Sequence, residues 1–322
     1  MKHKDYSSTY MSRSTELEDH ISVKGFDFEK FKGEDFDKAA FFDSFLSTGF
    51  QATELGKAIE ICKEMVASDS KIYVSMTGNV ISSGLRDVIV YLVKHGFVAG
   101  IVTTAAGVEE DVIKSLGDFK IGSFSASGRG LFEAGVGRIG NIFVPNSRYL
   151  DFERFMTDFF SKFEDKKVLS PSFITYELGK MLPKSSFLHW ASKLGVPVFC
   201  PGIIDGSLGD IAYFQNQRSK FAIDVVSDHK KIIDEALLVK SAGAILLGGG
   251  ISKHYLLNSQ IFRDGLDYAV YINVAEEAFG SDSGGNEEEA KSWAKIRIDG
   301  SHVKVKCDFT IAFPLIVAAA FS

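Results

Sequence analysis

The chain has 322 residues, of which 45% are hydrophobic and only 6 are proline, so it can bury a large core and is not a low-complexity protein. Its formal net charge of −6 disfavours a nucleic-acid partner, which selects for a basic face. No segment approaches the roughly 18 uninterrupted apolar residues of a membrane-spanning helix, and the amino terminus lacks the apolar core of a secretory signal. We therefore expect a cytoplasmic protein without a membrane or nucleic-acid partner.

The distribution of apolar residues predicts a polar amino-terminal arm over residues 1–22 and a single domain over residues 23–322. The predicted strands, in chain order, are Lys71–Met76, Val98–Thr103, Asn141–Val144, Val196–Cys200, Phe221–Val226, Ala244–Leu247 and Tyr268–Val274. The predicted helices between them are Leu85–His95, Val108–Leu116, Tyr149–Lys162, Asp228–Lys240 and His254–Gln260. Continuous apolar strands joined by helices predict an α/β fold, with one doubly wound, mostly parallel sheet and helices on both faces.

Polar or glycine-rich segments directly follow four of the predicted strands. They are TGNVISSG (Thr77–Gly84), TAAGVEED (Thr104–Asp111), PGIIDGSLGD (Pro201–Asp210) and GGGISKH (Gly248–His254). Ligands of doubly wound sheets bind outside the carboxyl ends of the strands. We therefore expect these four segments to meet at one edge of the sheet and to form a nucleotide-type site.

Several side chains in these segments suit a ligand, although each also fits an ordinary structural role. Asn79 and Ser82 either cap a helix or donate hydrogen bonds to ribose and pyrophosphate oxygens. Gly249 lies in a run of three glycines, which forms a tight turn or lets the backbone approach a cofactor closely. Glu110 either complements a helix dipole or binds an amine.

The same alternatives hold for the acidic and imidazole groups further along the chain. Asp205 and Asp210 form an acidic turn, or they hold a ribose hydroxyl and an ammonium group. His254 caps a helix, or it acts as a general acid or base, a role for which histidine is the most common side chain. The cysteines and the other histidines show no metal-ligand spacing, so we predict structural thiols and no metal.

The segment Gly280–Asp299, GSDSGGNEEEAKSWAKIRID, places Lys295 two positions after Trp293 in a stretch that also contains Asp282 and Glu289. An aromatic wall among carboxylates suits a ligand with several ammonium groups. The alternative is an acidic loop that leads into an amphipathic helix.

Taken in this order, the segments resemble the deoxyhypusine synthase family from about Val23 to the carboxy terminus. The resemblance is carried by GFDFEKF, TGFQAT, ISSGLRD, VTTAAGVEED, RIGNIFVPN, DGSLGD, LGGGISKH, DYAVYIN, GSDSG and SWAKIRID. It implies a Rossmann-like catalytic domain with NAD as cofactor. It also implies a transferase of hypusine biosynthesis, which moves the 4-aminobutyl group of spermidine to a lysine of the translation initiation factor 5A precursor.

The resemblance also implies a role for individual residues. Lys295 would be the nucleophile that carries the aminobutyl group as a covalent imine, with His254 as a second catalytic residue. The spermidine site would be lined by Glu110, Asp210, His254, Gly280, Ser281, Asp282, Glu289 and Trp293. The NAD site would be lined by Gly78, Asn79, Val80, Ile81, Ser82, Thr104, Ala105, Ala106, Glu110, Asp205, Gly249, Val274, Ala275, Asp308 and Phe309.

The family further implies a homotetramer with active sites at the subunit interfaces. Val274, Phe279 and Phe309 stand where its eukaryotic members usually have Thr, Asp and Ala, so the contacts on the adenosine side of NAD differ here. Two related functions remain open: a homospermidine synthase, which uses putrescine as acceptor, and a regulatory paralogue of an active subunit. A generic NAD-dependent dehydrogenase is disfavoured because the sequence contains no GxGxxG after its first strand.

Overall fold

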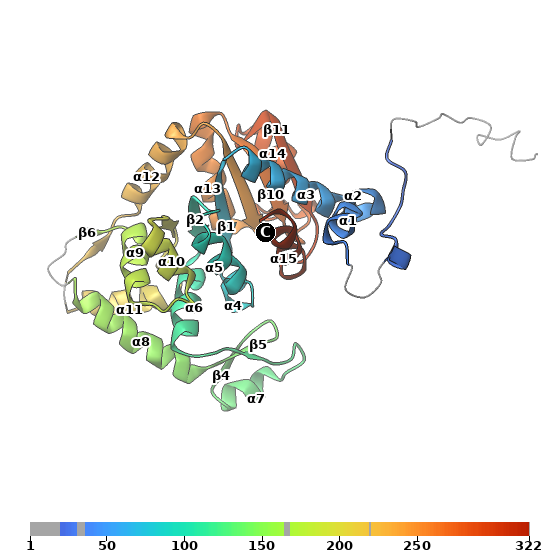
Figure 1. The fold of residues 1–322 in the computed structure, drawn as a ribbon. Coiled ribbons are helices and arrows are strands. Elements are labelled where there is room, and N and C mark those ends of the chain that lie inside the picture. The colour runs from blue at the N-terminus through green and yellow to red at the C-terminus, as the bar shows by residue number, and fades with distance from the viewer. Residues whose placement is uncertain (1–19, 31–35, 164–167, 219, 322) are drawn as a thin grey trace, which may run out of the picture.

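A six-stranded parallel sheet forms the centre of the protein. The computed structural model describes residues 20–30, 36–163, 168–218 and 220–321 (Figure 1). The strands of the sheet are β1 (Lys71–Met76), β2 (Gly100–Thr103), β7 (Val198–Phe199), β9 (Ala242–Leu247), β10 (Leu266–Ile272) and β11 (Ile296–Val305). They lie in the order β11-β10-β9-β1-β2-β7, and every neighbouring pair is parallel. The predicted α/β fold is confirmed.

Each face of the sheet buries its own set of side chains. Along β1, Val74 and Met76 join one apolar cluster, whereas Tyr73 joins the other. The same alternation separates Ile245 from Leu246 on β9. Because successive side chains of a strand point to opposite faces, both faces of this sheet are covered. Coverage on both faces explains why the strands are nearly continuous apolar runs in the sequence.

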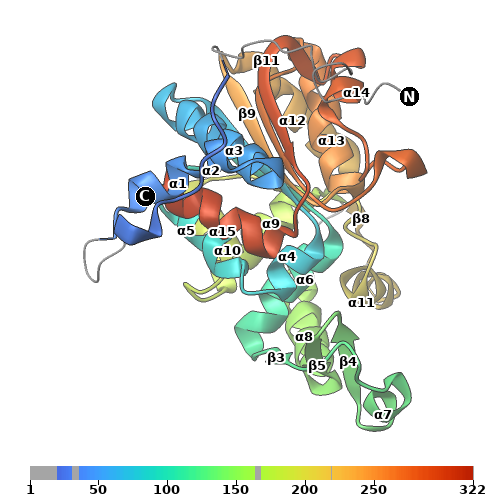
Figure 2. The same ribbon diagram turned by 90° about the vertical axis from the view of Figure 1, so that its right-hand side faces the viewer.

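Helices provide that coverage on both sides (Figure 2). One face packs against α3 (Phe50–Ala67), α5 (Arg86–Lys94) and α15 (Phe309–Ala320), and the other against α12 (Val225–Leu238) and α13 (Gly250–Gln260). The remaining helices are α1 (Lys38–Asp43), α2 (Phe45–Thr48), α4 (Gly78–Ser82), α6 (Ala105–Leu116), α7 (Gly128–Glu133), α8 (Asn146–Ser161), α9 (Pro171–Met181), α10 (Phe187–Leu194), α11 (Ser207–Asn216) and α14 (Glu287–Ser292). Short 3₁₀ turns are η3 (Phe28–Lys30), η4 (Ile261–Arg263) and η5 (Glu277–Phe279).

Two predicted strands lie outside the central sheet. The segment predicted at Asn141–Val144 is β5 (Ile142–Pro145), which pairs antiparallel with β3 (Lys120–Ile121) and β4 (Val136–Ile139). Together with α7 these strands form an arm, residues 120–145, that projects from the body (Figure 2). Of the strand predicted at Phe221–Val226, only β8 (Ala222–Ile223) forms, paired with β6 (Val168–Leu169), and α12 already begins at Val225.

Within Gly280–Asp299, the alternative of an acidic loop that leads into a helix is met only by the short α14 (Glu287–Ser292), and the end of the segment forms the edge strand β11 from Ile296. Only Ile296, Val303 and Val305 of its ten residues are buried, because β11 lies at the edge of the sheet. A register shift opposite Leu266 and Tyr268 further disrupts its alternation. Most of the predicted arm over residues 1–22 lies outside the described residues. No helix in the described part of the chain is long and apolar enough to cross a membrane.

Candidate functional site

The carboxyl ends of the parallel strands bring four sequence-predicted segments to one edge of the sheet, which we call the rim. Met76, the last residue of β1, lies opposite Thr103 on β2 and Leu247 on β9. The segments that begin at Thr77, Thr104 and Gly248 are therefore neighbours, as predicted. The segment after β7 lies on the far side of β2 from β1, since β7 pairs with β2.

The segments after β1 and β2 are in direct contact at the rim. A Cβ atom at Gly78 would lie 2.4 Å from the Cβ of Ala106, so glycine permits this close approach. The Ser82 hydroxyl donates to the Glu110 carboxylate. The Thr77 hydroxyl donates to Asn79 Oδ1 at 2.5 Å, which leaves the exposed Asn79 amide available at the amino end of α4.

Glu109 joins this group although the sequence analysis did not select it. Its carboxylate accepts the backbone N–H of Leu208 at 2.6 Å and so ties α6 to the DGSLGD segment. Burial raises the pKa of Glu109 to about 7, with Asp210 and Asp205 adding repulsion. Burial likewise raises the pKa of Glu110 to about 7, against the hydrogen bond from Ser82. The run of two glutamates was visible in the sequence, but its burial was not.

The glycine turn after β9 carries a second group. A Cβ at Gly249 would lie 2.5 Å from the Cα of Ser283, so the GSDSG loop lies directly on this turn. The ammonium group of Lys253, which is 3% exposed, donates to the carbonyl oxygen of Asp282. The Asp282 carboxylate lies 3.7 Å from the same ammonium, and its Oδ2 is buried without a hydrogen bond. Burial lowers the pKa of Lys253, which the sequence analysis also missed.

Lys295 follows a tight turn at the end of α14. The N–H of Ala294 donates to the Lys291 carbonyl and the N–H of Lys295 to the Ala290 carbonyl, both at 2.9 Å, which is the Schellman pattern. Ala294 occupies the left-handed position of that pattern, with φ +54°. The Lys295 side chain makes no hydrogen bond or ion pair within the described residues. Its neighbour Trp293 is 62% exposed.

The other predicted residues are spread around the rim. Asp308 caps α15 by accepting the Thr310 N–H at 2.8 Å. Ala275 lines a groove of about 860 Å³, together with α3 residues and several glutamates. His254 is exposed, and its ring lies 3.3 Å from the Asn258 amide. Val274 and Phe279 are also exposed, at 65% and 81%.

The predicted residues around Lys295 and those around Glu110 form two groups without a direct polar contact. Among the described residues, no hydrogen bond or ion pair joins Lys295 or Trp293 to Glu110, Asp205 or Asp210. A separate cavity of about 420 Å³ lies between α9, α10, β7 and α12, away from these residues. No group of three or more acidic, histidine or cysteine side chains within the described ranges is placed to hold a metal ion.

The fold defines a doubly wound α/β protein, and the rim at the carboxyl ends of its strands is its candidate ligand site. The family model of deoxyhypusine synthase matches residues 40–320. The chain is 43% identical to the deoxyhypusine synthase of Arabidopsis thaliana, over 98% of this chain and 94% of that protein. It is 44% identical to that of Senecio vernalis, over 93% of this chain and 89% of the relative. The chain therefore belongs to the deoxyhypusine synthase family.

A solved structure supports the assignment at the level of the fold. The crystal structure of a candidate deoxyhypusine synthase from Entamoeba histolytica superposes with a TM-score of 0.69 at 26% identity. The match covers 93% of this chain and 96% of that one. The central sheet and its helices are thus those of the family.

Proposed function

We propose that this protein transfers the 4-aminobutyl group of spermidine to a lysine of the translation initiation factor 5A precursor, with NAD as cofactor. The observation that carries the proposal is the placement of Lys295. Its backbone is fixed by the turn at Ala294, its ammonium has no ion-pair partner in the described chain, and Trp293 stands two positions before it. This combination suits a nucleophilic lysine rather than a lysine held in a structural ion pair.

The rim fits NAD. The amino ends of α6 and α13 face the rim, where backbone N–H groups favour phosphate oxygens, and the exposed Asn79 lies at the amino end of α4. Asn79, Ser82, Thr104 and Asp308 would hold the ribose and phosphate groups. When bound, NAD accepts a hydride from spermidine and later returns it, so it is not consumed.

Carboxylates at the rim are the groups that would bind the amines of spermidine. Glu110, Asp210, Asp282 and Glu289 offer acceptors, and a bound ammonium favours the ionised form of a carboxyl whose pKa is raised, such as Glu110. Fixing the amines would bring the reacting carbon to the nicotinamide at near-attack distance. His254 is exposed beside the glycine turn and would act as the general acid or base toward the substrate amine.

Lys295 would carry the transferred group. With NAD supplying the redox chemistry, the carbon beside the secondary amine of spermidine would become an imine, which the Lys295 amine would attack. The bond to 1,3-diaminopropane breaks, and the aminobutyl group stays on Lys295 as an imine. A lysine of the acceptor protein displaces Lys295, and return of the hydride reduces the new imine to the stable product.

The open position of Trp293 supports a site completed by a second copy of the chain. Imine intermediates hydrolyse in water, so the site must be closed. Trp293 is 62% exposed in one chain. A neighbouring subunit of a homotetramer would cover it and exclude water from the site.

The test uses purified protein, NAD and spermidine labelled in its aminobutyl part, with and without the factor 5A precursor. We expect label on the precursor and its complete loss in Lys295→Ala, which should still release some diaminopropane. A matched Lys291→Ala variant, two helix positions before the turn, should keep transfer. In a parallel assay with added putrescine, diaminopropane release with label on putrescine and none on the precursor would identify a homospermidine synthase. No turnover in either assay would refute both activities.

A further inference from the structure

Three side chains on one face of α6, Ala106, Glu110 and Lys114, contact α4 from its start to its end. Ala106 packs against Gly78 at the start of α4, and Glu110 accepts a hydrogen bond from Ser82 at its end. Lys114 lies one further turn along α6. Residues four apart lie on one face of a helix, so these three side chains of α6 form a continuous line of contact with the segment after β1.

Lys114 satisfies the carboxyl end of α4. Its Nζ donates to the carbonyl oxygens of Ile81 and Ser83, at 2.8 Å each, and lies 3.4 Å from that of Ser82. The last carbonyl groups of a helix have no partner within the helix, and a cation there also complements its dipole. No carboxylate forms an ion pair with Lys114 in the described chain. The charge of Lys114 is therefore directed at α4.

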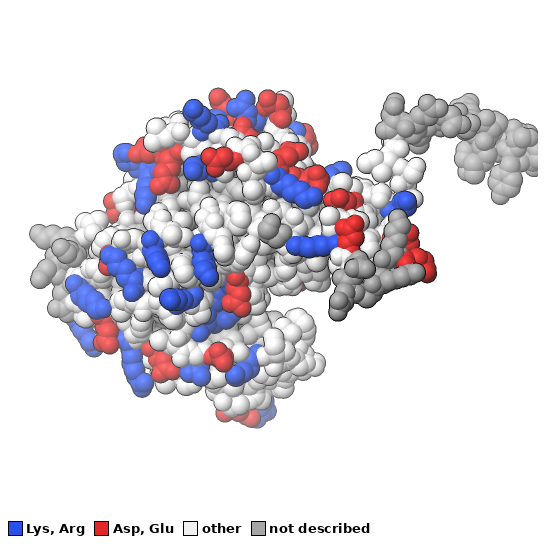
Figure 3. All heavy atoms as spheres, viewed as in Figure 1, with Lys and Arg blue, Asp and Glu red and all other residues white. Residues whose placement is uncertain are grey.

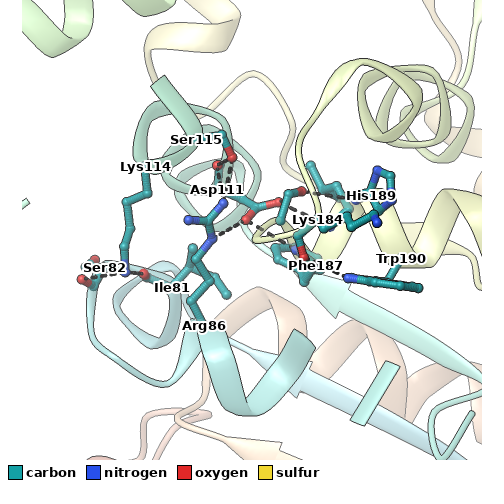
Figure 4. A network of polar contacts seen from close by, with 12 residues as sticks. Ile81, Ser82, Arg86, Asp111, Lys114, Ser115, Lys184, Phe187, His189 and Trp190 are labelled. Carbon is teal, nitrogen blue, oxygen red and sulfur yellow. Dashed lines mark hydrogen bonds and ion pairs between the residues drawn. The ribbon is translucent and has the colours of Figure 1, made fainter. Parts of the chain in front are cut away.

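The helix that carries Lys114 is itself fixed by a buried network (Figure 4). Arg86 Nε lies 2.6 Å from Asp111 Oδ1, and the two side chains are 7% and 0% exposed. Asp111 also accepts from the Ser186 hydroxyl and from the Leu188 N–H, at 2.5 and 3.1 Å. Since α5 and α10 are both tied to Asp111, the position of Lys114 relative to the sheet is well defined.

We propose that Lys114 is a positioning residue of the cofactor site, which holds α4 so that Ser82 meets Glu110 and the α4 backbone faces NAD. This inference rests on the proposed function, because NAD and spermidine are assigned there to α4 and Glu110. Lys114 acts through α4, since its ammonium is engaged by carbonyl groups at the end of the helix remote from Gly78 and Asn79.

The first test separates cofactor binding from turnover. Lys114→Met keeps the length of the side chain and removes its donors, so α4 loses charge-assisted hydrogen bonds. We expect the KM for NAD to rise on the order of tenfold, with a smaller fall in kcat. Lys114→Arg retains donors that reach the carbonyl groups and should restore most of the affinity. Lys193→Met, at an exposed lysine on α10, is the matched control and should behave as the wild type.

The second test uses the pH profile. Glu110 faces Glu109 on its own helix, Ser82 on α4, Tyr149 on α8 and Lys114. Burial is the main cause that raises the pKa of Glu110, and the Lys114 ammonium opposes it. Lys114→Met should therefore move the acidic limb of kcat/KM to higher pH, and Lys114→Arg should move it back. A purely structural role of Lys114 would lower activity without moving this limb.

The third test does not depend on activity. Amide hydrogen exchange of residues 78–83 should become faster in Lys114→Met and remain unchanged in Lys193→Met. Unchanged exchange, KM and pH profile would overturn the inference. If the wild type shows no NAD-dependent turnover, the proposed function fails, and the exchange measurement alone then decides whether Lys114 holds α4.

Discussion

Ala294 carries the least favourable backbone conformation near the proposed nucleophile. Its φ of +54° lies in the left-handed region, which costs an L-residue on the order of 1 kcal/mol relative to glycine. Because the turn at Ala294 makes both Schellman hydrogen bonds, Ala294→Gly should retain the geometry of Lys295 and its activity.

We expect Ala294→Gly to raise the free energy of unfolding by about 1 kcal/mol, measured by urea denaturation. The same substitution at Ala290, inside α14, should have the opposite sign because glycine is unfavourable in a helix interior. A destabilised Ala294→Gly variant would show that the alanine methyl group makes a compensating contact.

Glu109 and Glu110 make the stability of the protein depend on pH. Their pKa values, raised by burial from the ordinary 4.5 to about 7, mean that the folded state binds more protons than the unfolded state between these limits. The contribution of these two groups to the free energy of unfolding therefore falls as the pH rises through this window and levels off above about pH 7. Each ionised carboxylate costs on the order of 3 kcal/mol.

Glu110→Gln removes the cost of ionising a buried carboxyl at position 110, while the amide oxygen can still accept the hydrogen bond from Ser82. We expect the variant to be more stable than the wild type at pH 8 and nearly equal to it at pH 5, in urea denaturation at both pH values. The same difference at both pH values would mean that Glu110 titrates near its ordinary pKa in the folded protein. Aminobutyl transfer should fall, since the amine loses a carboxylate.

At the scale of elements, the rim depends on the close packing of the glycine turn and the GSDSG loop. Gly249 has φ −160°, which any residue adopts, so space alone excludes a side chain there. An alanine Cβ would lie 2.5 Å from the Ser283 Cα and would displace the loop that carries Asp282. Overpacking of this kind typically costs about 1–3 kcal/mol.

Gly249→Ala should therefore reduce transfer on the order of tenfold or more, because a displacement of about 1 Å at a reacting site has effects of that size. Gly84→Ala is the matched control, since no atom lies within 4 Å of the Cβ position there. Transfer assays with both variants check the prediction. Equal activity would place the GSDSG loop outside the reaction.

The strands that could be predicted from the sequence are those covered on both faces of the sheet, because burial on both sides requires a nearly continuous run of apolar residues. β1, β9 and β10 are mostly apolar and buried, and the polar segments after β1, β2 and β9 do meet at the rim. Of the arm over residues 120–145 only the strand at Asn141–Val144 was predicted, and β11 was not predicted as a strand, because a half-exposed strand carries few apolar residues and its pairing partner cannot be read from one segment. Lys253 and Glu109 were missed for a related reason: charged side chains are usually exposed, and only the folded structure shows that these two are buried.

At the scale of the whole molecule, large apolar side chains are exposed at two places, the arm over residues 120–145 and the groove beside α3. On the face shown in Figure 3, acidic and basic groups are interspersed, with lysines gathered over α9 and α10. The arm exposes Ile121, Phe124 and Phe132 at 81, 73 and 85%, and Phe50 beside the large groove is 98% exposed. Large exposed apolar groups of this kind mark sites of protein association.

We therefore predict that the arm over residues 120–145 contributes to the subunit interface of a homotetramer. Light scattering should give four times the 35.3 kDa mass of one chain. Phe124→Ser combined with Phe132→Ser removes rings that are mostly exposed in the single chain, so the folded monomer should lose less than about 0.5 kcal/mol. The double variant should nevertheless shift the mass toward smaller species at micromolar concentration.

In our proposal Trp293 is covered by a neighbouring subunit, so loss of that subunit should lower transfer together with the mass. A wild-type monomer that turns over spermidine would instead show that one chain closes its own site.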